Sequence, residues 1–459
     1  MISKSSYNIS ERKILLIIVD VAIIIASLFL CSKFLNFNYL FFSSPSILRW
    51  TLLVVFYYLI FGEIFLLYNL KISNNKYTIV RSVILTAFFT TFFYIFTPFI
   101  SPELPSNRFQ IFYLFLILFL PVLAWRFLYL WLIFSPKFFK NILIIGKSDI
   151  IKSLIIKINK DNQHNLQAYL SDKKVDEIEG FYDVSKVDIF SLINLDNTTE
   201  VIISTKDLPS EVVEKLNKEL VELFEQGVHI ISFETFYEDV NLRVPKEYSK
   251  NSFYKHLSFS RNNNNRFYLF SSRVLDIIFS IIGLAFLALI IPFLLIGNLL
   301  GNRGSLFYSQ KRVGKNGTNF SIYKLRSMVQ NAESGVAVWA VKNDVRITAF
   351  GKFLRNTRLD EFPQFYNILK GDMSIIGPRP ERPKFVNDLE KVIPFYSIRN
   401  AIRPGLTGWA QVNYPYANTI EEQETKLRYD LYYIKERSAF LDFKILIKTI
   451  TTVLFFRGQ

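Results

Sequence analysis

The chain has 459 residues, of which 51% are hydrophobic, and a formal net charge of +15 at pH 7. At ~150 residues per domain, this length allows about three domains. A single cysteine excludes a disulfide framework. The positive charge suits anionic lipids, nucleic acid or a phosphorylated substrate. Because long apolar runs open the chain, lipids and a phosphorylated substrate are favoured, and no nucleic-acid partner is expected.

Four apolar runs lie at about 13–31, 46–69, 78–100 and 109–134. Each is close to the ~20 residues that a helix needs to cross the hydrocarbon core of a membrane. Lys and Arg gather before the first run, between the second and third, and after the fourth, so both ends of this region are predicted to be cytoplasmic. Residues 1–139 therefore predict a four-helix transmembrane bundle. Within the runs, Glu63 and Arg126 are expected near the inner interface, snorkelling toward water rather than serving transport.

Residues 140–245 alternate strand-like and helical patterns. The strand-like segments are 141–146, 201–205 and 228–232, and a helix is expected at about 209–226. This alternation predicts an open parallel, Rossmann-like α/β sheet. Gly146 stands alone where dinucleotide binding needs G-x-G-x-x-G, so a structural, regulatory or nucleotide-sensing role is favoured over NAD binding.

A polar linker is predicted at 246–266, and a fifth apolar run follows at 274–300. Basic residues flank this run on both sides, which suits a helix that enters and leaves by the same membrane face. Pro292 interrupts the backbone hydrogen bonds and can form the kink that re-entry needs. A re-entrant helix is thus predicted at about 272–300, with an ordinary kinked span as the alternative. Arg273 and Asp276 lie three residues apart and are expected to pair.

The segment 267–459 contains no His and no Cys, which excludes Cys–His hydrolysis and disfavours a zinc site. In "RLDEFPQ" (358–364), Asp360 fits the N-cap of a helix that continues to Lys370. Capping needs one carboxylate, yet Glu361 stands beside it. A helix N-terminus also attracts phosphate. Asp360 could therefore attack phosphorus, and Glu361 could hold Mg²⁺, which prefers oxygen ligands and phosphate co-ligands. A purely structural cap stays open as the alternative.

Basic and polar side chains near stiff or glycine-containing turns are candidate substrate ligands. Three prolines stiffen "GPRPERP" (377–383), and guanidinium groups suit diphosphate oxygens. Trp409 and Gln411, in "RPGLTGWAQVN" (403–413), suit a base or a sugar. The candidate phosphate or substrate ligands are Lys311, Lys324, Arg326, Arg355, Arg379, Glu381, Arg403 and Gln411.

These motifs, in this order, resemble the bacterial sugar transferase family, the monotopic polyprenol-phosphate hexose-1-phosphate transferases. The resemblance covers about 267–459, and the preceding spans and α/β region are similar to the large form of the family. Two positions depart from its pattern: Ile291 precedes Pro292 where Ser is frequent, and Arg358 occupies a position that is often small and polar.

The resemblance implies that Asp360 is the nucleophile and that Glu361 helps to hold Mg²⁺. It also implies that Arg355 meets phosphate, with Lys324 or Lys311 and Arg379 as further contacts. The implied reaction transfers a sugar-1-phosphate from a UDP-sugar to undecaprenyl phosphate, releases UMP, and begins the synthesis of exopolysaccharide, capsule or O-antigen. The implied location is the bacterial inner membrane, with the catalytic domain facing the cytoplasm. The transferred sugar could be glucose, galactose or an N-acetylated sugar, and the protein could form a homo-oligomer; the sequence decides neither point.

Two other functions fit parts of the chain less well. A membrane-tethered nucleotide-sugar dehydratase or epimerase would use the α/β domain, but the missing glycine-rich loop argues against it. A non-catalytic scaffold for polysaccharide assembly rests on the spans alone, and the paired carboxylates argue against it.

Overall fold

The chain separates into two compact units, Met1–Phe236 and Tyr237–Gln459, and each is described by itself. The computed structural model describes residues 9–34, 46–68, 76–97, 100–102, 107–132, 140–158, 164–175, 179–187, 189, 198, 200–225, 227–246, 261–302, 304–329, 344, 346–414 and 417–454. Most of the predicted linker, residues 247–260, lies outside these ranges.

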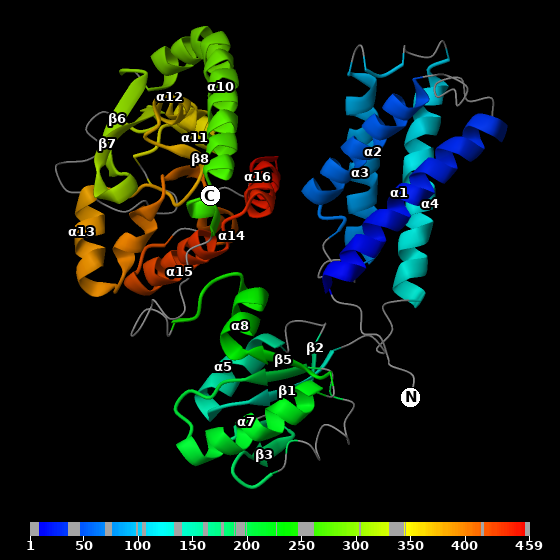
Figure 1. The fold of residues 1–459 in the computed structure, drawn as a ribbon. Coiled ribbons are helices and arrows are strands. Elements are labelled where there is room, and N and C mark those ends of the chain that lie inside the picture. The colour runs from blue at the N-terminus through cyan, green and yellow to red at the C-terminus, as the bar shows by residue number, and fades with distance from the viewer. Residues whose placement is uncertain are drawn as a thin grey trace. The chain divides into compact units, whose positions relative to one another are not determined.

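The first unit begins with four apolar helices (Figure 1). They are α1 (Ile9–Phe34), α2 (Ile47–Ile64), α3 (Lys76–Ile95) and α4 (Phe109–Leu132). Each is long and apolar enough to cross a membrane. Buried side chains from all four, including Leu16, Tyr58, Val83 and Leu118, share one core. The predicted apolar helices are therefore confirmed, while their placement in a bilayer stays a prediction.

An ion pair lies inside this core. The Arg126 guanidinium donates to Asp20 Oδ2 at 2.5 Å, and the two side chains are 3% and 0% exposed. The guanidinium also lies 5.3 Å from the ring centre of Tyr68. Arg126 therefore does not snorkel as predicted, because a carboxylate from α1 supplies its counter-charge in the interior. Glu63 is partly exposed and pairs with Lys13.

The rest of the first unit is an α/β sheet. Its elements are β1 (Lys140–Ile145), α5 (Ser148–Ile158), β2 (His164–Ser171), β3 (Phe181–Asp183), β4 (Glu200–Ile203), α7 (Ser210–Glu225) and β5 (His229–Ser232). Helix α8 (Phe233–Asn241) follows and continues into the second unit. All strand pairs are parallel, in the order β3-β2-β1-β4-β5. Helices α5 and α7 lie on opposite faces of the sheet (Figure 1). The predicted parallel α/β sheet is thus confirmed.

The turn from β1 to α5 is closed by protein groups. Asp172, directly after β2, accepts a hydrogen bond from the Ser148 backbone N–H at 2.9 Å. A Cβ on Gly146 would lie 3.3 Å from Ser204 Cβ, so the ends of β1 and β4 meet closely. In dinucleotide-binding sheets the pyrophosphate lies at this helix N-terminus. A carboxylate at that position repels phosphate. This argues against NAD binding, and therefore against a dehydratase or epimerase activity in this domain.

The second unit is built around α10 (Arg266–Gly301), a continuous 36-residue helix that contains Pro292. At 1.5 Å per residue it is about 54 Å long, well beyond the ~30 Å hydrocarbon core of a bilayer. Figure 1 shows that this helix curves toward one end. A proline removes one backbone hydrogen bond and clashes with the preceding turn, which accounts for a bend.

The remaining elements of this unit pack beside α10. They are the turn η3 (Arg261–Asn263), the antiparallel pair β6 (Phe307–Val313) and β7 (Asn319–Leu325) with η4 (Lys315–Gly317) between them, α11 (Ala349–Asn356), η5 (Leu359–Glu361), α12 (Gln364–Lys370), β8 (Ser374–Ile376), α13 (Pro383–Val392), η6 (Tyr396–Ala401), β9 (Gly405–Thr407), α14 (Trp409–Asn413), α15 (Ile420–Glu436) and α16 (Ala439–Leu454). Strands β8 and β9 form a short parallel pair. A core that includes Ile322, Ile368, Trp409 and Ile445 joins these elements.

The first half of α10 is bonded to α12 and β8. Arg273 donates to the carbonyls of Ile368 and Leu369 at 2.6 and 2.7 Å. Asp276 Oδ1 accepts from Ser374 Oγ at 3.0 Å and from the Ile375 N–H at 2.9 Å. The predicted Arg273–Asp276 pair is therefore wrong. The last carbonyls of α12 lack partners within their own helix, and they take the arginine instead.

The second half of α10 is held by the same unit. Asn302, next after the helix, donates to the Arg326 carbonyl at 2.7 Å. Two glycines face aromatic rings: a Cβ on Gly283 would lie 2.4 Å from Phe365 Cδ2, and one on Gly297 would lie 2.4 Å from Phe350 Cε2. Both ends of the long helix thus contact one compact body. Its remaining faces expose large apolar side chains, among them Phe267, Phe270, Ile281, Ile282, Leu289, Phe293, Ile296, Leu299 and Leu300.

Candidate active site

The paired carboxylates lie in a tight turn between α11 and α12. Arg358 adopts a left-handed conformation with φ of 58°, and η5 follows directly. Helix α12 begins only at Gln364, with Pro363 at its N-cap. The prediction that Asp360 caps α12 is therefore wrong, because the left-handed residue starts a separate 3₁₀ turn. Asp360 and Glu361 are both buried, at 7% and 8% exposure.

Glu361 is paired with two cations. Its Oε1 accepts from Arg379 NH2 at 2.9 Å and lies 3.3 Å from Lys324 Nζ. Burial alone would raise the pKa of this carboxyl, but the charges of Arg379, Lys324 and Arg358 outweigh burial and hold the pKa well below its usual range. Glu361 is consequently ionised at neutral pH.

Asp360 has the opposite environment. Burial raises the pKa of its carboxyl, the Glu361 charge raises it further, and Lys324 and Arg355 oppose both effects. Its Oδ1 is buried and has no hydrogen-bond partner among the described residues. Adjacent titratable groups with oppositely shifted pKa values are typical of sites that divide chemical roles between them. The lone pairs of Asp360 Oδ1 are thus not used by a donor in the part of the chain that the structure describes, and they could bind a cation or bond to an electrophile that reaches this buried position.

Three predicted cations gather at the carboxylates. Lys324 projects from β7, and Arg379 comes from the proline-rich loop. Arg355, on α11, donates from Nε to Ser327 Oγ at 2.9 Å and is close enough to lower the pKa of Asp360. A phosphate that approached Asp360 would meet positive charge from three separate elements.

Four other predicted ligands have no described contact with Asp360 or Glu361. Lys311 and Arg403 are exposed. Arg326 donates from Nε to the Ser305 carbonyl at 3.0 Å. Gln411 donates to the Leu406 carbonyl at 3.1 Å, and its Oε1 is buried without a described partner.

Trp409 is buried and is not available to stack on a ligand, which corrects the expectation from sequence. Its Nε1–H donates to the Leu242 carbonyl at 2.8 Å, and its ring stacks on Tyr432. Core packing and a satisfied indole N–H explain its burial.

Known proteins share the part of the chain that builds this site. A profile described as "Bacterial sugar transferase" matches residues 267–456. A relative from Bacillus subtilis (strain 168), named for undecaprenyl-phosphate N-acetylgalactosaminyl 1-phosphate transfer, is 45% identical over 159 residues, which are 35% of this chain and 87% of the relative. The chain belongs to the bacterial sugar transferase family.

Two further relatives each match about two fifths of the chain. UDP-N-acetylgalactosamine-undecaprenyl-phosphate N-acetylgalactosaminephosphotransferase of Aeromonas hydrophila is 44% identical over 187 residues, covering 41% of this chain and 44% of the relative. UDP-glucose:undecaprenyl-phosphate glucose-1-phosphate transferase of Xanthomonas campestris pv. campestris is 38% identical over 195 residues, covering 42% of this chain and 40% of the relative. The match therefore spans less than half of either relative.

The second unit also holds another charged cluster, which includes Glu381 of the proline-rich loop. Glu381, predicted as a substrate ligand, lies 2.5 Å from Lys426 Nζ and 3.7 Å from Arg312 NH1. Burial alone would raise its pKa, but Lys426 and Arg399 dominate and lower the pKa to about 2. Arg399 in turn pairs with Asp430 Oδ2 at 2.9 Å.

Sequence reasoning missed Arg399 and Asp430. One signal was present: Asp430 lies on α15 at helical spacing with Leu427, Leu431 and Ile434, which are all buried. A charged residue in an apolar stripe needs a buried partner.

The carboxylates suit a magnesium ion that arrives with its substrate. No group of three or more His, Cys, Asp or Glu side chains among the described residues could hold a metal by itself. Mg²⁺ is commonly bound by one or two carboxylates together with substrate phosphates. The two adjacent carboxylates offer this type of donor, and the lack of a described hydrogen-bond partner at Asp360 Oδ1 is compatible with a cation nearby.

Proposed function

We propose that this protein transfers a sugar-1-phosphate from a UDP-sugar to undecaprenyl phosphate and releases UMP, as an early membrane step of polysaccharide synthesis. The names of the Aeromonas and Xanthomonas relatives support the donor and acceptor classes. The observation that carries the proposal is the buried carboxylate pair. Glu361 is neutralised by two cations, while Asp360 Oδ1 has no hydrogen-bond partner among the described residues.

The proposed reaction has two displacements. An Asp360 oxygen attacks the β-phosphorus of the donor, an Asp–phosphorus bond forms, and the bond from that phosphorus to the UMP oxygen breaks. An oxygen of undecaprenyl phosphate then attacks the same phosphorus and releases Asp360, which leaves a lipid diphosphate sugar. Lys324, Arg355 and Arg379 stabilise charge on the phosphoryl oxygens, and such electrostatic stabilisation usually contributes most to the rate of phosphoryl transfer.

The proposed cofactor is Mg²⁺, which Glu361 would help to hold. When bound with the donor, it would neutralise charge on the diphosphate. Glu361 has a second role that needs no metal: it fixes Arg379 and Lys324 at the site.

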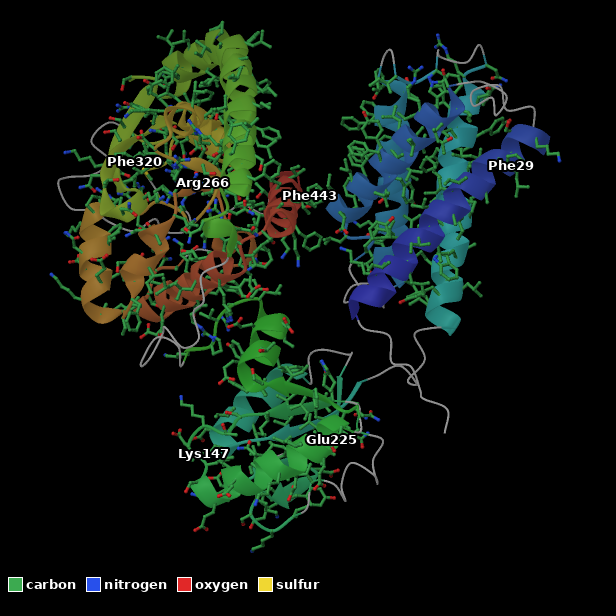
Figure 2. The ribbon with its side chains drawn as sticks, in the orientation of Figure 1. Phe29, Lys147, Glu225, Arg266, Phe320 and Phe443 are labelled. Carbon is green, nitrogen blue, oxygen red and sulfur yellow. The ribbon has the colours of Figure 1, made fainter. Side chains whose placement is uncertain are left out.

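The proposed membrane arrangement is a re-entrant α10 at about 272–300. A simple span would separate its ends by the bilayer, yet Arg273 and Asn302 bond to the same compact unit. Phe443, on α16 and labelled in Figure 2, adds an exposed apolar side chain to that unit. This geometry supports a catalytic unit that stays on one face of the membrane, and the basic residues on both sides of α10 favour the cytoplasmic face, where soluble donor and lipid acceptor would meet.

The proposed domains are a bundle at 1–139, an α/β domain at 140–245, a linker at 246–266 and the catalytic domain at 267–459. The residues just before the linker pack on the catalytic domain, because Arg428 Nε donates to the Val244 carbonyl at 2.7 Å.

The test is UMP release from membranes that contain the full chain, undecaprenyl phosphate, Mg²⁺ and a panel of UDP-sugars. The panel includes UDP-N-acetylgalactosamine and UDP-glucose, the donors named for two relatives. Asp360→Asn should abolish lipid-linked product while the protein stays in the membrane, and the exposed Asp388→Asn should behave as wild type. Without acceptor, donor labelled at the β-phosphate should leave label on wild-type protein and none on Asp360→Asn. Near-normal turnover of Asp360→Asn would refute the nucleophile assignment.

A further inference from the structure

The proline-rich loop has no regular structure, yet four consecutive carbonyls in it are each hydrogen-bonded. Prolines 378, 380 and 383 have no N–H, so the loop cannot form a ladder of its own. Its donors come from other elements: Gly405 N–H to the Pro378 carbonyl at 2.9 Å, Arg399 NH2 to Arg379 at 2.8 Å, Arg312 NH1 to Pro380 at 3.1 Å, and Val313 N–H to Glu381 at 2.9 Å.

Of the two side-chain donors, Arg399 is the more deeply buried. Its side chain is 3% exposed, and its guanidinium pairs with Asp430 Oδ2 at 2.9 Å. NH1 donates to the Tyr396 hydroxyl at 2.6 Å, and the guanidinium lies 5.2 Å from the Tyr396 ring centre. Burying an ion pair costs several kcal/mol of desolvation and often gives no net stability over apolar packing. A role beyond stability would explain why a charged pair occupies this position.

The bond from Arg399 is made to the backbone of a residue that reaches the carboxylates. Arg379 accepts from Arg399 through its carbonyl, while its own guanidinium donates to Glu361 Oε1 at 2.9 Å. A shift of the Arg379 peptide would move its Cα and therefore its side chain. Displacements of about 1 Å at a reacting centre can cost about 10²-fold in rate.

We propose that Arg399, held by Asp430 and Tyr396, is a positioning residue that fixes the Arg379 peptide and so sets the guanidinium against Glu361 at the reaction centre. The role rests on the proposed transfer reaction. Arg399 forms no described contact with Asp360 or Glu361, and its proposed effect on them passes through Arg379.

Arg428 provides a matched control in the same unit. Its side chain is also buried, its Nε donates to the Val244 carbonyl at 2.7 Å, and its NH2 donates to the Tyr237 hydroxyl at 2.5 Å. Its guanidinium lies 5.5 Å from the Tyr237 ring centre. Arg428 and Arg399 thus both donate to a backbone carbonyl and to a tyrosine hydroxyl, whereas Arg399 in addition pairs with Asp430 and has a carbonyl partner, Arg379, that reaches the carboxylates.

The experiment compares Arg399→Lys with Arg428→Lys in the full chain, by UMP release and by melting temperature. Lysine keeps the charge but lacks the planar guanidinium that donates to the Arg379 carbonyl and the Tyr396 hydroxyl at the same time. We expect Arg399→Lys to lower kcat/KM by about 10²-fold, mainly through kcat. Arg428→Lys should stay within about 2-fold of wild type at a similar loss of melting temperature.

A double-mutant cycle separates positioning from general destabilisation. If Arg399 acts through Arg379, then in an Arg379→Ala background Arg399→Lys should change kcat/KM by less than about 2-fold. Additive losses would overturn the proposal, as would equal activity of the Arg399→Lys and Arg428→Lys proteins. If Arg399→Lys does not fold, Asp430→Asn takes its place in the same cycle. Absence of UMP release by wild type with every donor would instead refute the proposed function.

Discussion

The pairing of Lys324 with Glu361 leads to a prediction about stability that does not depend on the reaction. The change is Lys324→Met, which keeps a long apolar side chain and removes the ammonium. Its matched control is Lys370→Met. Lys324 lies 3.3 Å from Glu361, with side chains 20% and 11% exposed. Lys370 lies 3.2 Å from Asp372, with side chains 61% and 22% exposed. The two pairs differ in burial and hardly in distance.

The magnitude follows from the contacts of Glu361. At an effective dielectric constant of ~20, the Lys324 and Arg379 distances correspond to about 5 and 6 kcal/mol of attraction. Burial lowers the pKa of Lys324, which means that desolvation of the ammonium offsets part of its attraction to Glu361. With Arg379 still in place we expect a loss of about 3 kcal/mol, at the low end for breaking a buried pair. That loss corresponds to about 6–12 °C in melting temperature for a unit of this size. The exposed control should lose at most about 1 kcal/mol.

The assay is the melting temperature of the full chain in detergent as a function of pH. The pKa of Glu361 is lower in the folded protein than its ordinary value of 4.5, so its ionisation contributes stability above that value. This contribution is lost as the pH falls through the folded-state pKa. The difference in melting temperature between wild type and Lys324→Met should therefore be largest at neutral pH and should become smaller in acid. A difference of constant size at every pH, or equal losses for the two lysines, would refute the reasoning.

Three further predictions concern other parts of the molecule. Gly283→Val should lower the melting temperature by an amount equivalent to about 1–3 kcal/mol, because its Cβ would lie 2.4 Å from Phe365 Cδ2; wild-type stability would contradict this packing. Asp20→Leu should lower the stability of the bundle by about 3–5 kcal/mol, because Arg126 loses its counter-charge. Adding Arg126→Leu should restore most of the resistance of the bundle to protease. A double variant as sensitive as Asp20→Leu would argue against the pair. UMP release should decline in acid above the usual range of an aspartate, because Asp360 must be ionised to attack and burial raises its pKa; a decline within the usual range would contradict this assignment.

Local patterns in the sequence were sufficient for most elements of the first unit, although strands β2 and β3 were not predicted. Continuous apolar runs predicted the four helices, and strand-like segments alternating with helices predicted the parallel sheet. Gly371, with φ of 98°, ends α12 at the predicted residue. These features depend on residues that are close in sequence, which is why periodicity and turn chemistry could find them.

Contacts between distant residues could not be predicted in this way. The Arg126–Asp20 pair joins positions 106 residues apart, and the sequence around Arg126 contains no pattern that identifies Asp20 as its partner. The expected Arg273–Asp276 pair failed because backbone groups of α12 and β8 competed for both side chains. At the site, the carboxylate pair and its cations were recognisable as a motif, whereas the support from Arg399 depends on a fold that brings η6 against the proline-rich loop.

The glycines of α10 have a mechanical consequence. The ring of Phe365 lies over Gly283, and that of Phe350 lies over Gly297 and Gly301, so the helix meets its neighbours at two separate levels. Sliding it by one turn in either direction would drive at least one of the rings into a bulky side chain of α10. In the proposed arrangement, the height of the carboxylates above the acyl chains is therefore fixed by protein packing. A thinner or thicker bilayer would have to deform around the enzyme, since the enzyme has no easy way to adjust its depth.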